Sequence, residues 1–69
     1  MNTEEFNQLL ESIELLKGFF KDEPNKVALW FTIENPLLGN IKPIDFFYIS
    51  RGYKVLAFIK GCLDENELI

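Results

Sequence analysis

The chain has 69 residues, the size of one small domain with a thin margin of stability. Its 11 acidic and 7 basic residues give a formal charge of −4, and the basic residues are dispersed, which disfavours binding to a phosphate backbone. The lack of histidine and the single cysteine exclude a disulfide framework, a His/Cys zinc site and a histidine-activated nucleophile. The hydrophobic fraction of 48% is too high for a disordered chain.

The sequence carries no export or membrane signal. Its first residues, Met1 to Glu5, are acidic where a secretory signal is basic. No uncharged run approaches the length of a membrane span. We therefore expect a cytoplasmic protein that makes no membrane contact and keeps Cys62 as a reduced thiol.

The first segment has the apolar periodicity of an amphipathic helix. Its apolar residues recur at spacings of three and four, namely Phe6, Leu9, Leu10, Ile13, Leu16 and Phe20. Asn2 or Thr3 can cap the start of such a helix. The spacing predicts a helix over 3–20 that ends between Lys17 and Lys21.

A second helix is predicted over 24–35. Pro24 suits the first helical position, and Asn35 precedes a proline, which pushes it out of the helical region. Apolar residues lie on nearly every side of this helix, namely Val27, Ala28, Leu29, Trp30, Phe31 and Ile33. A helix of this kind is usually central and buried, so we expect Trp30 in the core.

The segment 36–41 is an apolar loop. It contains three large apolar side chains, although connecting loops are usually polar. Gly39 and Asn40 favour a turn because both residues tolerate a positive φ. The loop is expected either to pack beneath the domain or to face a partner.

Two further helices are predicted in the remaining chain. Pro43 opens a short helix over 43–50, and a fourth helix covers 53–63. Gly52 is expected to take the left-handed conformation that ends the short helix. Strands are the alternative for two runs rich in β-forming residues, Phe46–Ile49 and Val55–Ile59. Because the prolines and glycines lie at helix-edge positions, we expect an all-α, compact bundle of about four helices, with a single domain over 1–69.

Few side chains are available for catalysis. The carboxylate pairs Glu11/Glu14 and Glu65/Glu67 lie where solvated helix surfaces or a tail are expected. The residues directly beside Cys62 in the sequence are not cations of the kind that lowers a thiol pKa, so a packed thiol is expected. We therefore expect no enzyme, no catalytic residue, no metal site and no cofactor.

The chain carries more apolar side chains than a core of this size can fully bury. Seven phenylalanines and one tryptophan occur among 69 residues. Large aromatic residues are typical anchors of protein interfaces. The composition therefore predicts a contiguous apolar surface patch that pairs with another chain.

The order of short motifs between Ala28 and Glu65 resembles the toxin-binding domain of Xre/MbcA/ParS-type antitoxins. The matching features are Ala28, Trp30, Asn35-Pro36, Leu38-Gly39, Pro43-Ile44, Gly52 and the apolar run Val55 to Ile59. They cover a little over half of the chain. The resemblance implies an all-α module that binds and neutralises a RES-type toxin, a class that consumes NAD.

The resemblance also implies which residues contact the toxin. In this family the last segment reaches toward the active site of the toxin, and the turn before the last helix also faces the partner. The residues implied here are Leu38, Gly39, Arg51, Gly52, Asp64, Glu65, Glu67, Leu68 and Ile69. Family members usually carry an N-terminal helix-turn-helix, whereas only one helix precedes the matching region here, so DNA binding by this chain alone is not expected.

The apolar surplus supports a second function that needs no toxin. The same patch could pair with another copy of the chain, which would make a homo-oligomeric structural or adaptor protein. A homo-oligomer is expected under either hypothesis, and light scattering with a search for a heterologous partner separates the two.

Overall fold

The computed structural model describes residues 1–64. They form four α-helices and one short 3-10 helix, in the order α1 (Thr3–Phe19), α2 (Pro24–Thr32), η1 (Pro36–Leu38), α3 (Pro43–Tyr48) and α4 (Gly52–Asp64). No strand forms in these residues, although an isolated antiparallel bridge joins Asn35 and Ile41. The predicted all-α bundle with a short third helix is therefore confirmed, and helices occupy both runs for which strands were the alternative.

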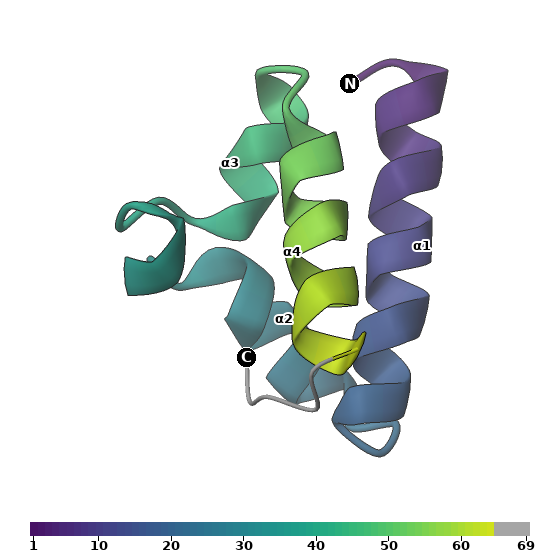
Figure 1. Cartoon of the computed structure of the whole chain (residues 1–69). Coiled ribbons are helices and arrows are strands. Elements are labelled where there is room, and N and C mark those ends of the chain that lie inside the picture. Colours follow the sequence, from purple (N-terminus) through teal and green to yellow (C-terminus); the bar gives the residue numbers. More distant parts are fainter. Residues whose placement is uncertain (65–69) are drawn as a thin grey trace.

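The two longest helices, α1 and α4, lie side by side and run in the same direction (Figure 1). Near their starts, the Gly52 N–H of α4 donates a hydrogen bond of 3.2 Å to Oε2 of Glu5 on α1. Further along both helices, Nζ of Lys60 lies 2.9 Å from Oε2 of Glu11. α2 and α3 pack on this pair and complete the bundle.

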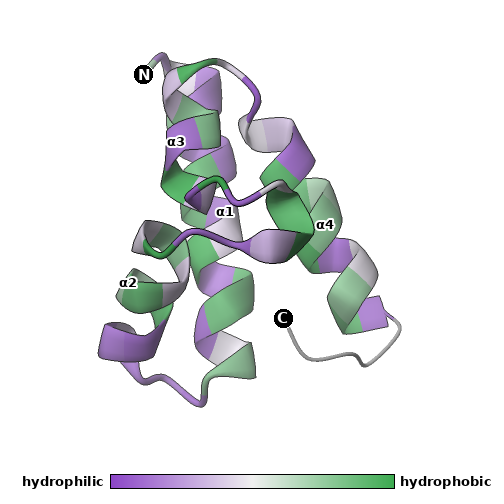
Figure 2. Cartoon of the chain, turned by 90° about the vertical axis from the view of Figure 1, so that its left-hand side faces the viewer, coloured by the Kyte–Doolittle hydropathy of each residue, from purple (hydrophilic) through white to green (hydrophobic). Residues whose placement is uncertain are grey.

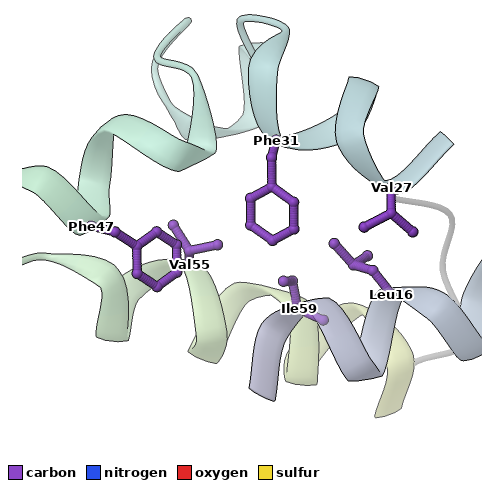
Figure 3. Close-up of a cluster of buried hydrophobic side chains, with 6 residues drawn as sticks. All are labelled: Leu16, Val27, Phe31, Phe47, Val55 and Ile59. Carbon is purple, nitrogen blue, oxygen red and sulfur yellow. The ribbon is translucent and has the colours of Figure 1, made fainter. Parts of the chain in front are cut away.

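Each of the four α-helices contributes to one hydrophobic core (Figure 3). Its buried residues are Leu16 from α1, Val27 and Phe31 from α2, Phe47 from α3, and Val55 and Ile59 from α4. The rings of Phe31 and Phe47 approach to 6.3 Å between centroids. The core therefore joins elements that are distant in sequence, and no helix is buried on all sides.

The first helix, Thr3–Phe19, agrees with the predicted 3–20 to within one residue. Oδ1 of Asn2 accepts a hydrogen bond of 2.8 Å from the Glu5 N–H, which makes Asn2 the N-terminal cap. The helix ends at Phe19, inside the predicted interval.

The second helix is shorter than its sequence predicts, because it ends at Thr32 instead of residue 35. Ile33 already has extended backbone angles, with φ −100° and ψ 140°. Two residues later, the Asn35 N–H donates a hydrogen bond of 3.1 Å to the carbonyl of Ile41. This bridge closes the 36–41 loop and requires an extended backbone on the approach to Asn35. The helix therefore ends several residues before the proline.

The turn between α3 and α4 differs from the prediction. Ser50 takes the left-handed conformation, with φ 59°, whereas Gly52 is the first residue of α4. The short helix consequently ends at Tyr48, two residues early, and α4 extends one residue beyond each end of the predicted 53–63. The expectation that Gly52 provides the left-handed cap is wrong, because Ser50 takes that conformation two residues earlier and Gly52 is already helical.

Candidate protein-interaction surface

Many large apolar side chains remain at the surface of residues 1–64. Ten are exposed, namely Met1, Phe6, Leu10, Leu29, Ile33, Leu37, Ile41, Tyr48, Ile49 and Tyr53. Figure 2 shows apolar segments on the face that carries α2, α3 and the loop between them. The exposed side chains form candidate partner surfaces, since soluble monomers rarely display large contiguous apolar patches.

The clearest apolar surface is a hollow between the end of α2 and η1, which we call the α2–η1 hollow. Its volume is about 440 Å³, and its lining residues are Leu29, Trp30, Ile33, Glu34, Asn35, Pro36 and Leu37. Leu29, Ile33 and Leu37 are 55%, 56% and 67% exposed. This surface therefore combines a concave shape with apolar side chains that remain largely exposed to solvent.

Asn35 and Gly39 determine the shape of the loop that borders the α2–η1 hollow. Oδ1 of Asn35 accepts a hydrogen bond of 2.9 Å from the Leu37 N–H, and its carbonyl accepts bonds from two further backbone N–H groups. Gly39 has φ 77° and caps η1 in the left-handed region, which glycine adopts without a steric penalty. The chain thus turns tightly enough to hold the Leu37 side chain out toward solvent.

Trp30 links the hollow to the core. Its ring stacks on Phe58 at 6.5 Å between centroids and meets Phe31 edge-on at 5.1 Å. The side chain is half-buried, and its Nε1 is shielded from solvent without a hydrogen-bond partner. Trp30 therefore lies at the edge of the core and also lines the hollow, whereas the sequence predicted a core position alone.

A second hollow of about 320 Å³ lies between α1 and α2 and is bordered by α3. Its lining residues are Leu9, Ile13, Lys17, Pro24, Val27, Ala28, Phe31, Thr32 and Ile44. Only Lys17 in this lining is charged, and its Nζ lies 3.4 Å from Oε1 of Glu14. This hollow is almost wholly apolar, but its large residues are less exposed than Leu29, Ile33 and Leu37.

The residues implied by the family resemblance that fall within 1–64 are spread over η1 and both ends of α4. Leu38 is half-buried and Gly39 is exposed at η1, whereas Arg51 is exposed in the turn before α4. Asp64 is exposed at the far end of α4, about 18 Å from the start of that helix at 1.5 Å per residue. The remaining predicted contacts lie outside the described residues, namely Glu65, Glu67, Leu68 and Ile69.

Gly52 is buried, and its lack of a side chain allows neighbouring elements to pack closely against it. A Cβ at this position would lie 2.5 Å from Oε2 of Glu5 and would overlap the ring of Phe47. The missing side chain lets α1 and α3 approach the start of α4, and it leaves the Gly52 N–H free to bond with Glu5. Any contribution of Gly52 to a partner surface is therefore through the shape of the turn.

The sequence did not single out Leu29, Ile33 and Leu37 as surface contacts. Leu29 and Ile33 were noted only as a second apolar side of a helix expected to be buried. The available signal was the combination of that second apolar side with the following apolar loop. Because the helix ends at Thr32, Ile33 leaves the bundle and joins the loop at the surface.

Other kinds of site find little support in the described part of the chain. Residues 1–64 contain no group of three or more His, Cys, Asp or Glu side chains placed to hold a metal ion. None of the helices formed by these residues combines the length and apolar character needed to cross a membrane. Comparison of the chain with protein families, with curated proteins and with solved structures finds no significant match.

Proposed function

We propose that the chain is a non-catalytic protein-interaction module that binds its partner through the α2–η1 hollow. The observation that carries this proposal is the exposure of Leu29, Ile33 and Leu37 around the half-buried Trp30. Interface anchors are typically large apolar and aromatic side chains in a concave, desolvated site. A partner that covers this hollow would remove apolar surface from water.

We further propose that the partner is a cognate toxin of the RES type, which the module neutralises in the cytoplasm. This finer proposal is supported by the motif residues that resemble the antitoxin domain. In the structure Asn35 caps η1, Gly39 supplies the left-handed turn, and Pro43 begins α3. Of these residues, Asn35 lines the α2–η1 hollow and Gly39 ends η1 beside it, whereas Pro43 begins the next helix.

Co-expression with the reading frame next to the gene tests this proposal. The chain should relieve the growth arrest and NAD depletion that a RES-type neighbour causes, and the two proteins should co-purify. The Ile33→Asp variant places a charge in the hollow and should lose both effects. Leu10→Asp is the matched control, because it changes an exposed apolar residue of α1, away from the hollow.

Two results would contradict the toxin proposal. One is that no RES-type protein co-purifies with the chain. The other is that Ile33→Asp and Leu10→Asp neutralise the toxin equally well, which would separate neutralisation from the hollow.

A homo-oligomeric adaptor is the second candidate function. The lining of the α2–η1 hollow contains a single charged residue, Glu34, so two copies could meet there with little repulsion. Light scattering should then show a stable oligomer that Ile33→Asp converts to a monomer, with no other protein bound. A monomer at high concentration would contradict this candidate.

A further inference from the structure

The turn between α3 and α4 displays an unusual set of side chains, which we call the basic corner. It comprises Tyr48, Ile49, Arg51, Tyr53 and Lys54, all of them exposed. None of the 11 acidic residues of the chain lies between Phe46 and Leu63, although the net charge is −4. Basic charge is therefore concentrated around α4 in a chain that is acidic elsewhere.

The two cations of the basic corner have no acidic partner within residues 1–64. The ion pairs of this part of the chain join Lys17 to Glu14, Lys26 to Glu23 and Lys60 to Glu11. Arg51 only donates a hydrogen bond of 3.3 Å from Nη1 to the carbonyl of Ser50. The nearby Glu5 carboxylate is buried and accepts the bond from the Gly52 N–H, so it does not cover the exposed face of the corner.

The backbone holds the basic corner in one shape. Ser50 takes the left-handed conformation, and the Arg51 N–H donates a hydrogen bond of 2.8 Å to the carbonyl of Phe46. Phe47 and Glu5 close around Gly52 beneath the turn. A partner that binds this corner would therefore lose little backbone freedom at this site.

We propose that the basic corner binds the acidic segment of residues 64–69 of a second copy of the chain. That segment contains Asp64, Glu65 and Glu67, followed by Leu68 and Ile69. Its carboxylates complement Arg51 and Lys54, and its apolar pair matches the exposed Tyr48, Ile49 and Tyr53. This proposal goes beyond the toxin-binding function and uses a different surface from the α2–η1 hollow.

The acidic segment begins at the opposite end of α4 from the basic corner of its own chain. Gly52 and Asp64 are the first and last residues of α4, about 18 Å apart along its axis. Three residues of fully extended chain span at most about 11 Å, so on the same molecule the Glu67 backbone stays short of the corner, and an ion pair would require the segment to fold back along α4. A contact between two copies has no such requirement and joins the start of one α4 to the end of another.

Sedimentation velocity of the full chain tests the proposal. Because exposed ion pairs are individually weak, the measurement should extend from about 10 μM to about 1 mM protein. At low salt, about 20 mM, the weight-average mass is expected to rise at least about 1.5-fold over this range, and about 0.5 M salt should reverse the rise. A chain that stays monomeric at about 1 mM and low salt overturns the proposal.

Two charge-reversed variants identify the contacting surfaces. R51E/K54E and E65K/E67K should each remain monomeric alone, and an equimolar mixture of the two should regain association. K21E/K42E is the matched control, because it makes the same charge change away from the corner and should associate as the unmodified chain does. Association that survives R51E/K54E, or that Ile33→Asp removes, would assign self-association to another surface and overturn the proposal.

Discussion

At the scale of single residues, the two turns that flank α3 depend on different conformational solutions. The turn before α3 places Gly39 and Asn40, two residue types that tolerate a positive φ, in this region, whereas the turn after α3 places Ser50 there. Gly52 is an ordinary helical residue, and glycine is needed there because the structure leaves no room for a Cβ. A glycine in the sequence therefore indicates special geometry but does not say whether conformation or space requires it.

Replacement of Gly52 by alanine should destabilise the fold. The new Cβ would overlap Phe47 and press on Glu5, and overpacking of this kind costs about 1–3 kcal/mol. Gly61→Ala, in the same helix, is the matched control, since a Cβ at that position would meet nothing within 4 Å. That control should gain about 0.5–1 kcal/mol from better helix propensity, and urea unfolding with circular dichroism measures both. Equal effects of the two substitutions would contradict the packing role of Gly52.

Replacement of Ser50 by glycine should stabilise the protein. A left-handed residue with a Cβ is strained, and relief of that strain, offset by the greater chain entropy of glycine, leaves a gain of about 0.5–1 kcal/mol. Ser50→Ala keeps the Cβ and should give no such gain. If thermal unfolding shows the alanine variant to be as stable as the glycine variant, the strain at this turn is not real.

At the scale of elements, the buried Glu5 carboxylate joins two helices that are 47 residues apart in sequence. It accepts a hydrogen bond from the first N–H of α4, which has no partner within its own helix. Glu5 is only 6% exposed, so this bond lies in a largely water-free contact. The start of α4 is thus capped by a side chain from α1, a feature that sequence spacing does not reveal.

Removal of this carboxylate should loosen the contact between α1 and α4. Glu5→Ala leaves the Gly52 N–H buried without a partner, which should lower the free energy of unfolding by about 1–3 kcal/mol. Glu5→Gln keeps an acceptor oxygen and should lose less. The control is Glu4→Ala at the neighbouring exposed position, for which urea unfolding should show a change of about 0.5 kcal/mol or less. A Glu5→Ala variant as stable as this control would contradict the cross-helix cap.

Sequence patterns predicted the helices better than they predicted the ends of the helices. The stripe of α1 and the cap at Asn2 were sufficient to place that helix closely. The early end of α2 depends on the bridge from Asn35 to Ile41, and the start of α4 depends on the close packing of Phe47 and Glu5 around Gly52. Both are contacts between segments, so local periodicity could not supply them.

At the scale of the whole molecule, more large hydrophobic residues of the described chain are exposed than are buried in the core. Six hydrophobic residues are buried, whereas ten large hydrophobic residues of the described chain are exposed. The sequence predicted an apolar surplus from composition alone, and the exposed side chains agree with it. It could not say which residues form the surface, because that division depends on where α2 ends and how the next loop turns.

A substitution that places a charge in the α2–η1 hollow should leave the stability of the fold nearly unchanged. Ile33 is 56% exposed, so Ile33→Asp should change the free energy of unfolding by only about 0.5 kcal/mol. Phe31→Ala is a contrasting variant, because it empties a core position and should cost about 3–5 kcal/mol. Urea unfolding of both variants checks the division, and a large loss for Ile33→Asp would place that residue in the core.

A comparative pull-down of the tagged chain and its Ile33→Asp variant from native extract tests directly whether the chain binds a partner through the α2–η1 hollow. The unmodified chain should retain one stoichiometric partner, of RES-toxin type, and the variant should lose it while staying folded. Equal retention by both proteins, or recovery of the unmodified chain alone as a monomer, would contradict partner binding through the hollow.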